Sequence, residues 1–256
     1  TERGAAVTIE ALRLGAVDYV TKPRGRPEDI AHDADVLRCK VKAAARASAR
    51  PGPSALPRIG RVNGACVDGA VIAVGSSTGG VEALFSLLPA LPEDTPPVLV
   101  VQHMPGAFTA HFARRLDAEC RMRVVEATDG TTPARGTVYI APGGNAHMEL
   151  ASPGRIRLRE GDPVTGHRPS VDALFLSVAR HITEAVGVIL TGMGMDGAMG
   201  LLAMRHAGAR TFGQSAQSCV VYGMPRAARE AGAVETELSL AAMPEAILAA
   251  CRHEKA

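Results

Sequence analysis

The stretch from Val71 to Leu84 constrains the fold of this chain more than any other. It begins with four consecutive apolar residues, Val71–Val74, passes through a Gly/Ser/Thr cluster, and then places apolar residues at helical spacing. An apolar run without polar alternation predicts a buried strand, and the glycines predict a tight turn into a helix. Strand, turn and helix in this order are the repeating unit of a parallel α/β sheet.

The turn in this stretch carries a hydroxyl at a chemically useful place. Gly75, Ser77 and Gly79 match G-x-S-x-G, the pattern that projects a nucleophilic serine from the top of an α/β sheet. The N-terminus of the following helix would offer N–H groups to an oxyanion. The same residues are also compatible with a plain glycine-rich turn that has capping serines, because short motifs occur by chance.

Short apolar strands and helical stretches alternate along the rest of the chain. This alternation predicts an α/β fold: a doubly wound, mostly parallel sheet with helices on both faces and a short antiparallel hairpin at one edge. The expected strands are Val98–Val101, Arg123–Glu126, Thr137–Ile140 and Val186–Leu190, the helices 109–120, 170–181 and 197–207, and the hairpin strands Met148–Leu150 and Arg155–Leu158.

A proline-rich linker over 51–67 divides the chain into an N-terminal part, 1–50, and a main domain, 68–256. In the N-terminal part we expect a helix over 5–14, a short strand over Val17–Val20, and helical structure within 29–50. The first two elements cannot bury a core alone. We therefore expect residues 1–25 to pack on another part of the chain or to be mobile.

Composition excludes several classes of protein. A formal net charge of +2 is too small to indicate nucleic acid as a partner. No apolar run approaches the roughly 18 residues of a membrane span, and no stretch has the pattern of a signal peptide. The five cysteines are scattered without a C-x-x-C pair, which argues against a disulfide framework or a zinc site. We therefore expect a cytoplasmic protein without membrane insertion or a bound metal.

Three polar residues follow three different predicted strands. Ser77, His103 and Asp196 each lie where a strand ends, and open α/β sheets place their sites at those ends. A hydroxyl, an imidazole and a carboxylate are the groups that nucleophilic acyl chemistry needs. Taken singly, the histidine could be structural and the aspartate a turn or helix-capping residue. His147 and His167 are the nearest alternatives for the base.

Six motifs resemble those of the chemotaxis protein-glutamate methylesterases. They are Val-Gly-Ser-Ser-Thr-Gly-Gly, Gln-His-Met-Pro, Tyr-Ile-Ala-Pro-Gly, His-Arg-Pro-Ser-Val-Asp, Ile-Leu-Thr-Gly-Met-Gly-Met-Asp-Gly and Ser-Cys-Val-Val-Tyr-Gly-Met-Pro. The resemblance covers about 68–254 and implies a catalytic domain over 68–256. It also implies a serine hydrolase that removes methyl groups from glutamate γ-methyl esters on the cytoplasmic helices of chemoreceptors and deamidates receptor glutamines. No cofactor or metal is expected.

The resemblance also assigns roles. Ser77 would be the nucleophile, His103 the base and Asp196 the orienting acid, with backbone N–H groups of Thr78 and Met193 holding the oxyanion. Ser76 stands where the family often has alanine, so either serine could attack, and the G-x-S-x-G spacing favours Ser77. If Asp196 lacks the third role, Asp172 is the first alternative.

Residues 11–23, Ala-Leu-Arg-Leu-Gly-Ala-Val-Asp-Tyr-Val-Thr-Lys-Pro, resemble the last portion of a response-regulator receiver domain. By this resemblance 1–50 is the C-terminal fragment of a receiver-like domain plus a helix. In that family the Lys before Pro contacts a phosphorylated aspartate, and here it would be Lys22. A complete receiver domain would take its phosphoryl group from a histidine kinase. The printed sequence holds neither that aspartate nor its acidic partners, so we expect Lys22 to be a solvated surface residue.

Two other classes of function remain open at this point. Residues 75–80 could cradle a phosphate as a nucleotide-binding loop, although they lack both the P-loop ending and the dinucleotide spacing. The chain could also be a regulatory protein that binds receptors without catalysis. Reaction of Ser77 with a fluorophosphonate would separate the enzyme from both.

Overall fold

The computed structural model describes residues 2–20, 66–152 and 154–252, and, between the first two ranges, residues 34, 37, 38, 40–42, 44 and 45. Lys22, residues 51–65 of the expected linker and most of the helical stretch expected within 29–50 lie outside the described residues.

A seven-stranded sheet in the order β3-β4-β2-β1-β7-β8-β9 forms the centre of the fold, and all its pairings are parallel. The strands are β1 (Val71–Ser76), β2 (Val98–Gln102), β3 (Arg123–Glu126), β4 (Thr137–Ile140), β7 (Ala185–Ile189), β8 (Arg210–Gln214) and β9 (Thr236–Leu238). This confirms the predicted parallel α/β sheet. Strand β1 lies between β2 and β7, where the strand order reverses, so the site is expected at the carboxyl ends of these three strands.

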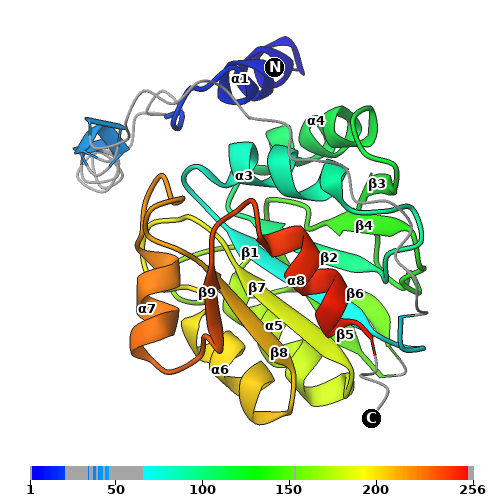
Figure 1. The fold of residues 1–256 in the computed structure, drawn as a ribbon. Helices are drawn as coiled ribbons and strands as arrows, with labels where there is room; N and C mark the ends of the chain where they lie inside the picture. The colour runs from blue at the N-terminus through cyan, green and yellow to red at the C-terminus, as the bar shows by residue number, and fades with distance from the viewer. Residues whose placement is uncertain are drawn as a thin grey trace.

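Side chains of β1 alternate between the two faces of the sheet, as the pleat requires. Ile72 and Val74 join the apolar cluster that includes α3, α4 and α8, whereas Val71 and Ala73 join the cluster with α5, α6 and α7. Helices therefore cover both faces, as predicted (Figure 1). They are α3 (Gly80–Leu87), α4 (Gly106–Asp117), α5 (Val171–His181), α6 (Ala198–His206), α7 (Met224–Glu230) and α8 (Met243–Ala250), with a 3₁₀ turn at Leu88–Ala90.

The expected antiparallel hairpin is present as β5 (Ala146–Ala151) and β6 (Arg155–Glu160). It forms a two-stranded sheet of its own and packs on α5, where the N–H of Leu150 donates to Ser177 Oγ at 2.9 Å. The hairpin thereby covers part of the helix that carries the polar groups described below.

The N-terminal helix α1 (Glu2–Arg13) packs on the main domain against α3 and α4. Its Ile9 and Leu12 are buried in the same apolar cluster as those helices, and Glu10 pairs with Arg115 at 3.4 Å. Of the two outcomes expected for this segment, packing is the one observed. The strand expected over Val17–Val20 was wrong, because these residues have no strand beside them among the described residues and follow an irregular path.

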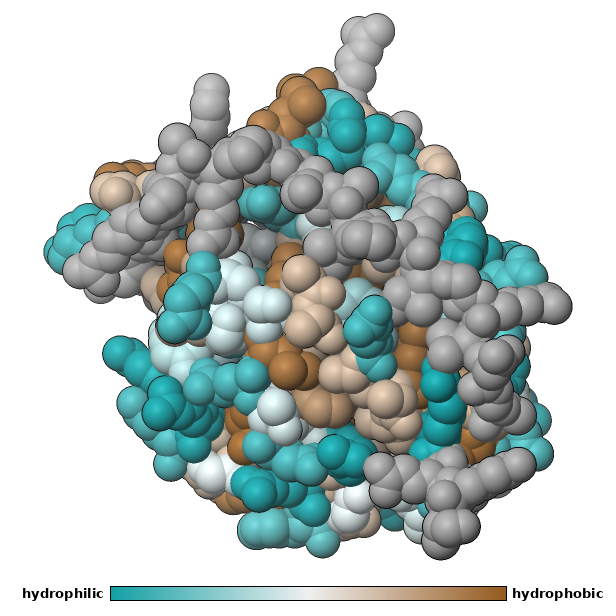
Figure 2. All heavy atoms as spheres, in the orientation of Figure 1, coloured by the Kyte–Doolittle hydropathy of each residue, from teal (hydrophilic) through white to brown (hydrophobic). Residues whose placement is uncertain are grey.

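The exposed surface is mixed in character. Figure 2 shows hydrophilic residues surrounding a smaller hydrophobic area on the face seen in Figure 1. Within the described parts of the chain, no helix is long and apolar enough to cross a bilayer.

Candidate active site

Ser77 lies on the turn between β1 and α3, as the sequence predicts. Two glycines make this turn possible. A Cβ on Gly75 would lie 2.2 Å from Val171 Cγ1, so only glycine lets β1 approach α5 here. Gly79 caps α3 with φ of +79°, a left-handed conformation that costs glycine little.

The two neighbouring serines differ sharply in their surroundings. Ser76 is fully buried, and its hydroxyl donates to Gln102 Oε1 at 2.7 Å. Ser77 is partly exposed and lines a pocket of about 590 Å³, to which Ser76 does not contribute. The amide of Gln102 also donates to the carbonyl of Ser77 at 2.9 Å and so fixes the turn. Of the two serines, only Ser77 is placed to meet a substrate.

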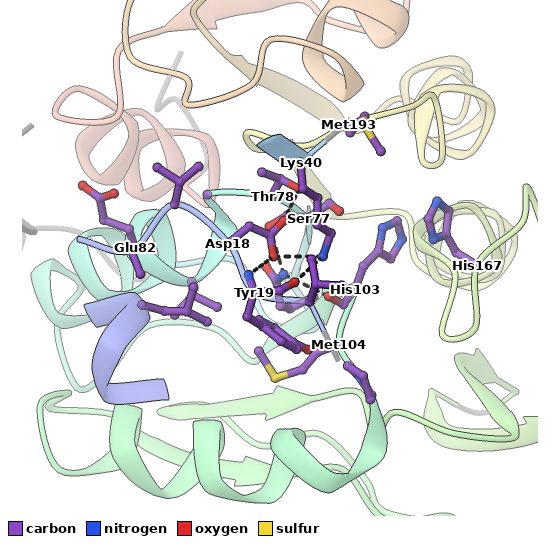
Figure 3. A pocket seen from close by; sticks show the side chains of 18 of the residues that line it. Asp18, Tyr19, Lys40, Ser77, Thr78, Glu82, His103, Met104, His167 and Met193 are labelled. Carbon is purple, nitrogen blue, oxygen red and sulfur yellow. Dashed lines mark hydrogen bonds and ion pairs between the residues drawn. The ribbon is translucent and has the colours of Figure 1, made fainter. Parts of the chain in front are cut away.

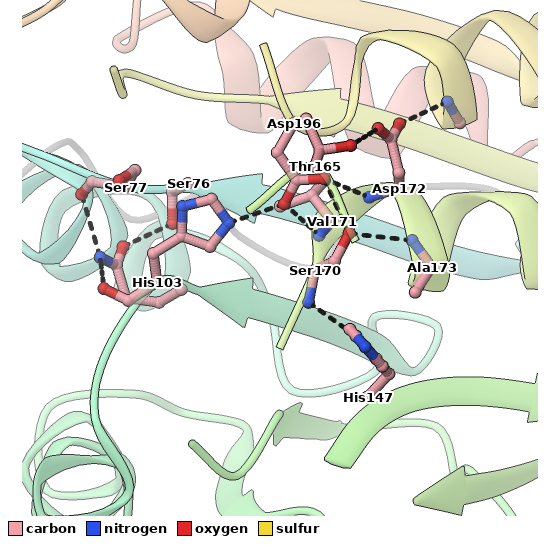
Figure 4. Close-up of polar contacts among 12 residues, drawn as sticks. Ser76, Ser77, His103, His147, Thr165, Ser170, Val171, Asp172, Ala173 and Asp196 are labelled. Carbon is pink, nitrogen blue, oxygen red and sulfur yellow. Dashed lines mark hydrogen bonds and ion pairs between the residues drawn. The ribbon is translucent and has the colours of Figure 1, made fainter. Parts of the chain in front are cut away.

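His103 follows β2 and lines the same pocket as Ser77. Its Nε2 is 2.8 Å from Asp196 Oδ2, whereas its Nδ1 is buried and has no hydrogen-bond partner among the described residues. Figure 4 shows the ring between Ser77 and Asp196. Ser77 and His103 are not hydrogen-bonded to each other in this structure. The unpaired Nδ1 is therefore the ring nitrogen that is free to accept the hydroxyl proton of a serine.

Asp196 lies in the loop after β7 and is fully buried. Besides His103, its carboxylate accepts hydrogen bonds from Ser170 Oγ at 2.7 Å and from the N–H groups of Val171 at 2.7 Å and Asp172 at 3.0 Å. Burial on its own raises the pKa of Asp196, but the hydrogen bond and charge of His103, together with these N–H donors, hold the pKa below its usual value. The N-terminus of α5 thus keeps Asp196 ionised beside His103.

Asp172, the alternative third residue, does not contact His103. Its carboxylate accepts from the N–H of Gly200 at 2.7 Å and from Thr165 Oγ1 at 3.0 Å, which ties the start of α5 to α6. Burial, with the nearby charge of Asp196, raises the pKa of this carboxyl. Of the two carboxylates, only that of Asp196 is hydrogen-bonded to His103.

The two other candidate histidines occupy different places. His147 is fully buried, with Nε2 2.9 Å from the carbonyl of Asp162 and Nδ1 accepting from the N–H of Ser170 at 3.2 Å. It therefore supports the start of α5. His167 lines the pocket and stacks on His103. Burial and the charge of His103 lower the pKa of His167 to about 4.

The two expected oxyanion donors, Thr78 and Met193, also line the pocket. Among the described residues, no hydrogen bond engages the backbone N–H of either one. Two unengaged N–H groups beside a serine can bind the oxygen that becomes negative when a carbonyl is attacked.

The N-terminal segment forms one wall of this pocket (Figure 3). Asp18 accepts a hydrogen bond from Thr78 Oγ1 at 2.5 Å and pairs with Lys40 at 3.0 Å, and the Tyr19 ring packs on Phe108. Sequence reasoning missed this wall, the stacked ring of His167 and the hydrogen bond from Ser170 to Asp196. In the described part of the chain, no group of three or more His, Cys, Asp or Glu residues is arranged to hold a metal ion.

Comparison with known proteins matches this architecture to one family. The family model described as CheB methylesterase matches residues 72–247. The chain belongs to the CheB methylesterase family. Among CheB relatives, the "Protein-glutamate methylesterase/protein-glutamine glutaminase 1" of Caulobacter vibrioides is 54% identical, over 97% of this chain and 73% of the relative. The corresponding protein of Agrobacterium fabrum is 51% identical, over 97% of this chain and 72% of its own length.

A solved CheB structure agrees with the fold. The crystal structure of the Thermotoga maritima CheB methylesterase catalytic domain aligns with a TM-score of 0.68 at 38% identity, covering 72% of this chain and 99% of that chain. The family resemblance expected from the six motifs is thereby confirmed.

Proposed function

We propose that this chain is a serine hydrolase that removes methyl groups from glutamate γ-methyl esters of chemoreceptors and deamidates receptor glutamines to glutamate. Its relatives carry the names of both activities, and it shares half of its residues with them. The catalytic residues we assign are Ser77, His103 and Asp196, with Thr78 and Met193 as oxyanion donors.

One observation carries this assignment. His103 is held at Nε2 by a buried, ionised Asp196 while its Nδ1 remains unpaired in the pocket that Ser77 lines. A structural histidine would have both ring nitrogens satisfied, as His147 has. A buried ring nitrogen without a partner is the arrangement that a general base requires before substrate binds.

Acylation follows from these positions. A receptor glutamyl ester places its carbonyl carbon against Ser77 Oγ, and His103 Nδ1 accepts the hydroxyl proton as the serine attacks. The carbonyl oxygen gains charge and is stabilised by the N–H groups of Thr78 and Met193. Asp196 stabilises the imidazolium, which then gives its proton to the departing methoxide, so that methanol leaves.

Deacylation repeats the same steps with water. His103 Nδ1 takes a proton from water, the hydroxide attacks the acyl-enzyme, and Ser77 leaves with that proton, which yields glutamate. A glutamine side chain presents the same carbonyl with ammonia as leaving group, so deamidation uses the same residues. The neutral ring of His167 shields one face of His103 from water throughout.

The wider assignments rest on the sequence. We propose the cytoplasm as the location and chemoreceptor cytoplasmic helices as the partner. The domain boundaries we propose are a receiver-like fragment over 1–50, a linker over 51–67 and the catalytic domain over 68–256. A histidine kinase would be a partner through a complete receiver domain, in which Lys22 would act.

The alternative functions fit the pocket less well. A phosphate-binding loop would leave the His103–Asp196 pair without a role, and it would place the phosphate close to the buried charge of Asp196. A regulatory protein without catalysis would not need a buried, unpaired imidazole nitrogen, which costs folding free energy.

A fluorophosphonate probe tests the proposal directly. The wild-type chain should be labelled on Ser77, Ser77→Ala should lose the label, and Ser76→Ala should keep it. Methanol release from methylated receptor should fall by about 10⁴-fold or more in Ser77→Ala, because the nucleophile of a cooperating triad is lost. Equal loss in both serine variants would contradict the assignment.

A further inference from the structure

Two cysteines that are far apart in the sequence meet beside the segment that leads into β1, because Cys66 precedes that strand and Cys251 follows α8. Cys66 forms an isolated antiparallel bridge with Arg252, and the N–H of Val67 donates to the carbonyl of Cys251 at 2.9 Å. The segment leading into β1 is thus paired with the end of α8 (Figure 1). In this pairing Cys66 faces Arg252 and Val67 is hydrogen-bonded to Cys251, so the two cysteines are diagonal neighbours across the pairing.

The two cysteines pack in the same apolar cluster, and their environments differ. Hydrogen bonding between the two thiols shifts the pKa of each. Cys66 is partly exposed, whereas Cys251 is 2% exposed and packs in the apolar cluster with Ile247 and Leu248. A small oxidant can therefore reach Cys66, whereas the buried Cys251 is protected from solvent.

The surrounding charges favour the thiolate of Cys66. The Arg135 guanidinium donates to the Cys66 carbonyl at 3.3 Å, and Arg252 lies across the bridge. The hydrogen bond from Cys251, followed by the charges of Arg135 and Arg252, lowers the pKa of Cys66 to about 6. The same hydrogen bond, together with burial, raises the pKa of Cys251. At neutral pH one sulfur is a nucleophile and the other keeps its proton.

We propose that Cys66 and Cys251 are a peroxide-reactive pair that forms a reversible disulfide. The Cys66 thiolate attacks one oxygen of a hydroperoxide. The O–O bond breaks, and the departing oxygen takes up a proton to leave as water or alcohol, while Cys66 becomes a sulfenic acid. The Cys251 sulfur then attacks the Cys66 sulfur, its proton leaves with the hydroxyl as water, and the S–S bond forms. Two thiols are oxidised by two electrons, and one peroxide is reduced.

The disulfide would join the start of β1 to the end of α8. Neither cysteine lines the Ser77 pocket, so the cross-link acts on the stability of the domain and not on the chemistry. Disulfides that form in a reducing compartment are usually transient, which fits a reversible cross-link. The four described cysteines form no disulfide with one another in this structure.

The test uses the full chain, reduced and then treated with one equivalent of hydrogen peroxide. Remaining thiols are blocked with N-ethylmaleimide, and the peptides are mapped by mass spectrometry. We expect a Cys66–Cys251 linked peptide that dithiothreitol removes. In Cys251→Ser, dimedone should trap a sulfenic acid on Cys66. The matched control Cys120→Ser should form the linked peptide as wild type does.

Three results would overturn the proposal. The first is a linked peptide that joins a different pair, such as one containing Cys39. The second is absence of the dimedone adduct on Cys66. The third comes from a thermal melt: a cross-link compatible with the native fold should raise Tm by about 5–10 °C, so an unchanged or lower Tm would show that the pair is not poised to bond.

Discussion

The imidazole ring of His103 lies flat against that of His167, with ring centroids 3.8 Å apart and planes 10° from parallel. The two rings come from separate parts of the chain, one after β2 and the other before α5. With its pKa lowered to about 4, His167 is neutral near pH 7. It can therefore pack against His103 without opposing the positive charge that His103 would gain in the proposed reaction.

Removal of this ring should weaken catalysis through the orientation of His103. We expect His167→Ala to lower kcat/KM for methanol release by about tenfold, because a stacked aromatic pair contributes about 0.5–1.5 kcal/mol beyond area burial. His167→Phe keeps a flat ring and should stay within about threefold of wild type. Equal losses in the two variants would mean that a nitrogen of His167, and not its ring plane, acts in the reaction.

The same residue should make folding stability depend on pH. The pKa of His167 falls from an ordinary 6.5 to about 4 in the folded state, so the unfolded chain binds more protons between these values. The contribution of His167 to the free energy of unfolding is complete above pH 6.5 and should decline as the pH falls toward 4. We expect this decline to be about 1–2 kcal/mol after allowance for the partial exposure of the ring. Urea titrations at pH 7 and 4.5 should show this decline, and His167→Phe should show a smaller one. An identical decline in the variant would assign it to other groups.

Much of the site was predictable because its residues follow strands with simple signals. The apolar runs of β1, β2 and β7 are continuous, and each is followed by glycine or by a polar loop. Parallel strands bring such loops to one edge of the sheet, so Ser77, His103 and Asp196 were expected together. The pocket contains the first two, and the third is bonded to His103.

The remaining features depend on contacts that no local pattern encodes. Nothing in the residues around Ser170 indicates that its hydroxyl bonds to Asp196, although serine is a common N-cap residue and Ser170 caps α5. The path of residues 16–20 is set by Thr78 and Phe108, not by their own β propensity. Strands β8 and β9 and helices α7 and α8 were not placed from sequence, and neither of these strands contains a continuous apolar run like those of β1, β2 and β7.

Asp196 and Asp172 offer a direct comparison of two buried carboxylates. Asp196→Asn places an amide where four hydrogen-bond donors converge, so it cannot hold the imidazolium of His103. We expect kcat to fall by about 10²–10⁴-fold with measurable activity remaining, because Asp196 orients and stabilises His103 but does not itself attack. Asp172→Asn should lower kcat by less than tenfold, since its partners are Gly200 and Thr165. The reverse order of the two losses would transfer the third role to Asp172.

Asp18 should limit access to the pocket through its bond to Thr78. Its carboxylate holds residues 16–20 against the loop that carries the proposed nucleophile, with Lys40 bound to the same carboxylate. We expect Asp18→Ala to lower KM for a methylated receptor peptide by about threefold with kcat unchanged, because a net hydrogen bond of about 1 kcal/mol no longer holds the wall in place. Steady-state methanol release measures both constants.

Glu10→Ala is the matched control for Asp18→Ala. Glu10 is a carboxylate of the same N-terminal segment, but it pairs with Arg13 and Arg115 and does not line the pocket. Its loss should leave KM unchanged, because α1 remains anchored by Ile9 and Leu12. If Asp18→Ala instead raised KM, residues 16–20 would be a surface to which the substrate binds. An increase in kcat with unchanged KM would point to the charge of Asp18 opposing the oxyanion at Thr78, since a nearby carboxylate disfavours developing negative charge.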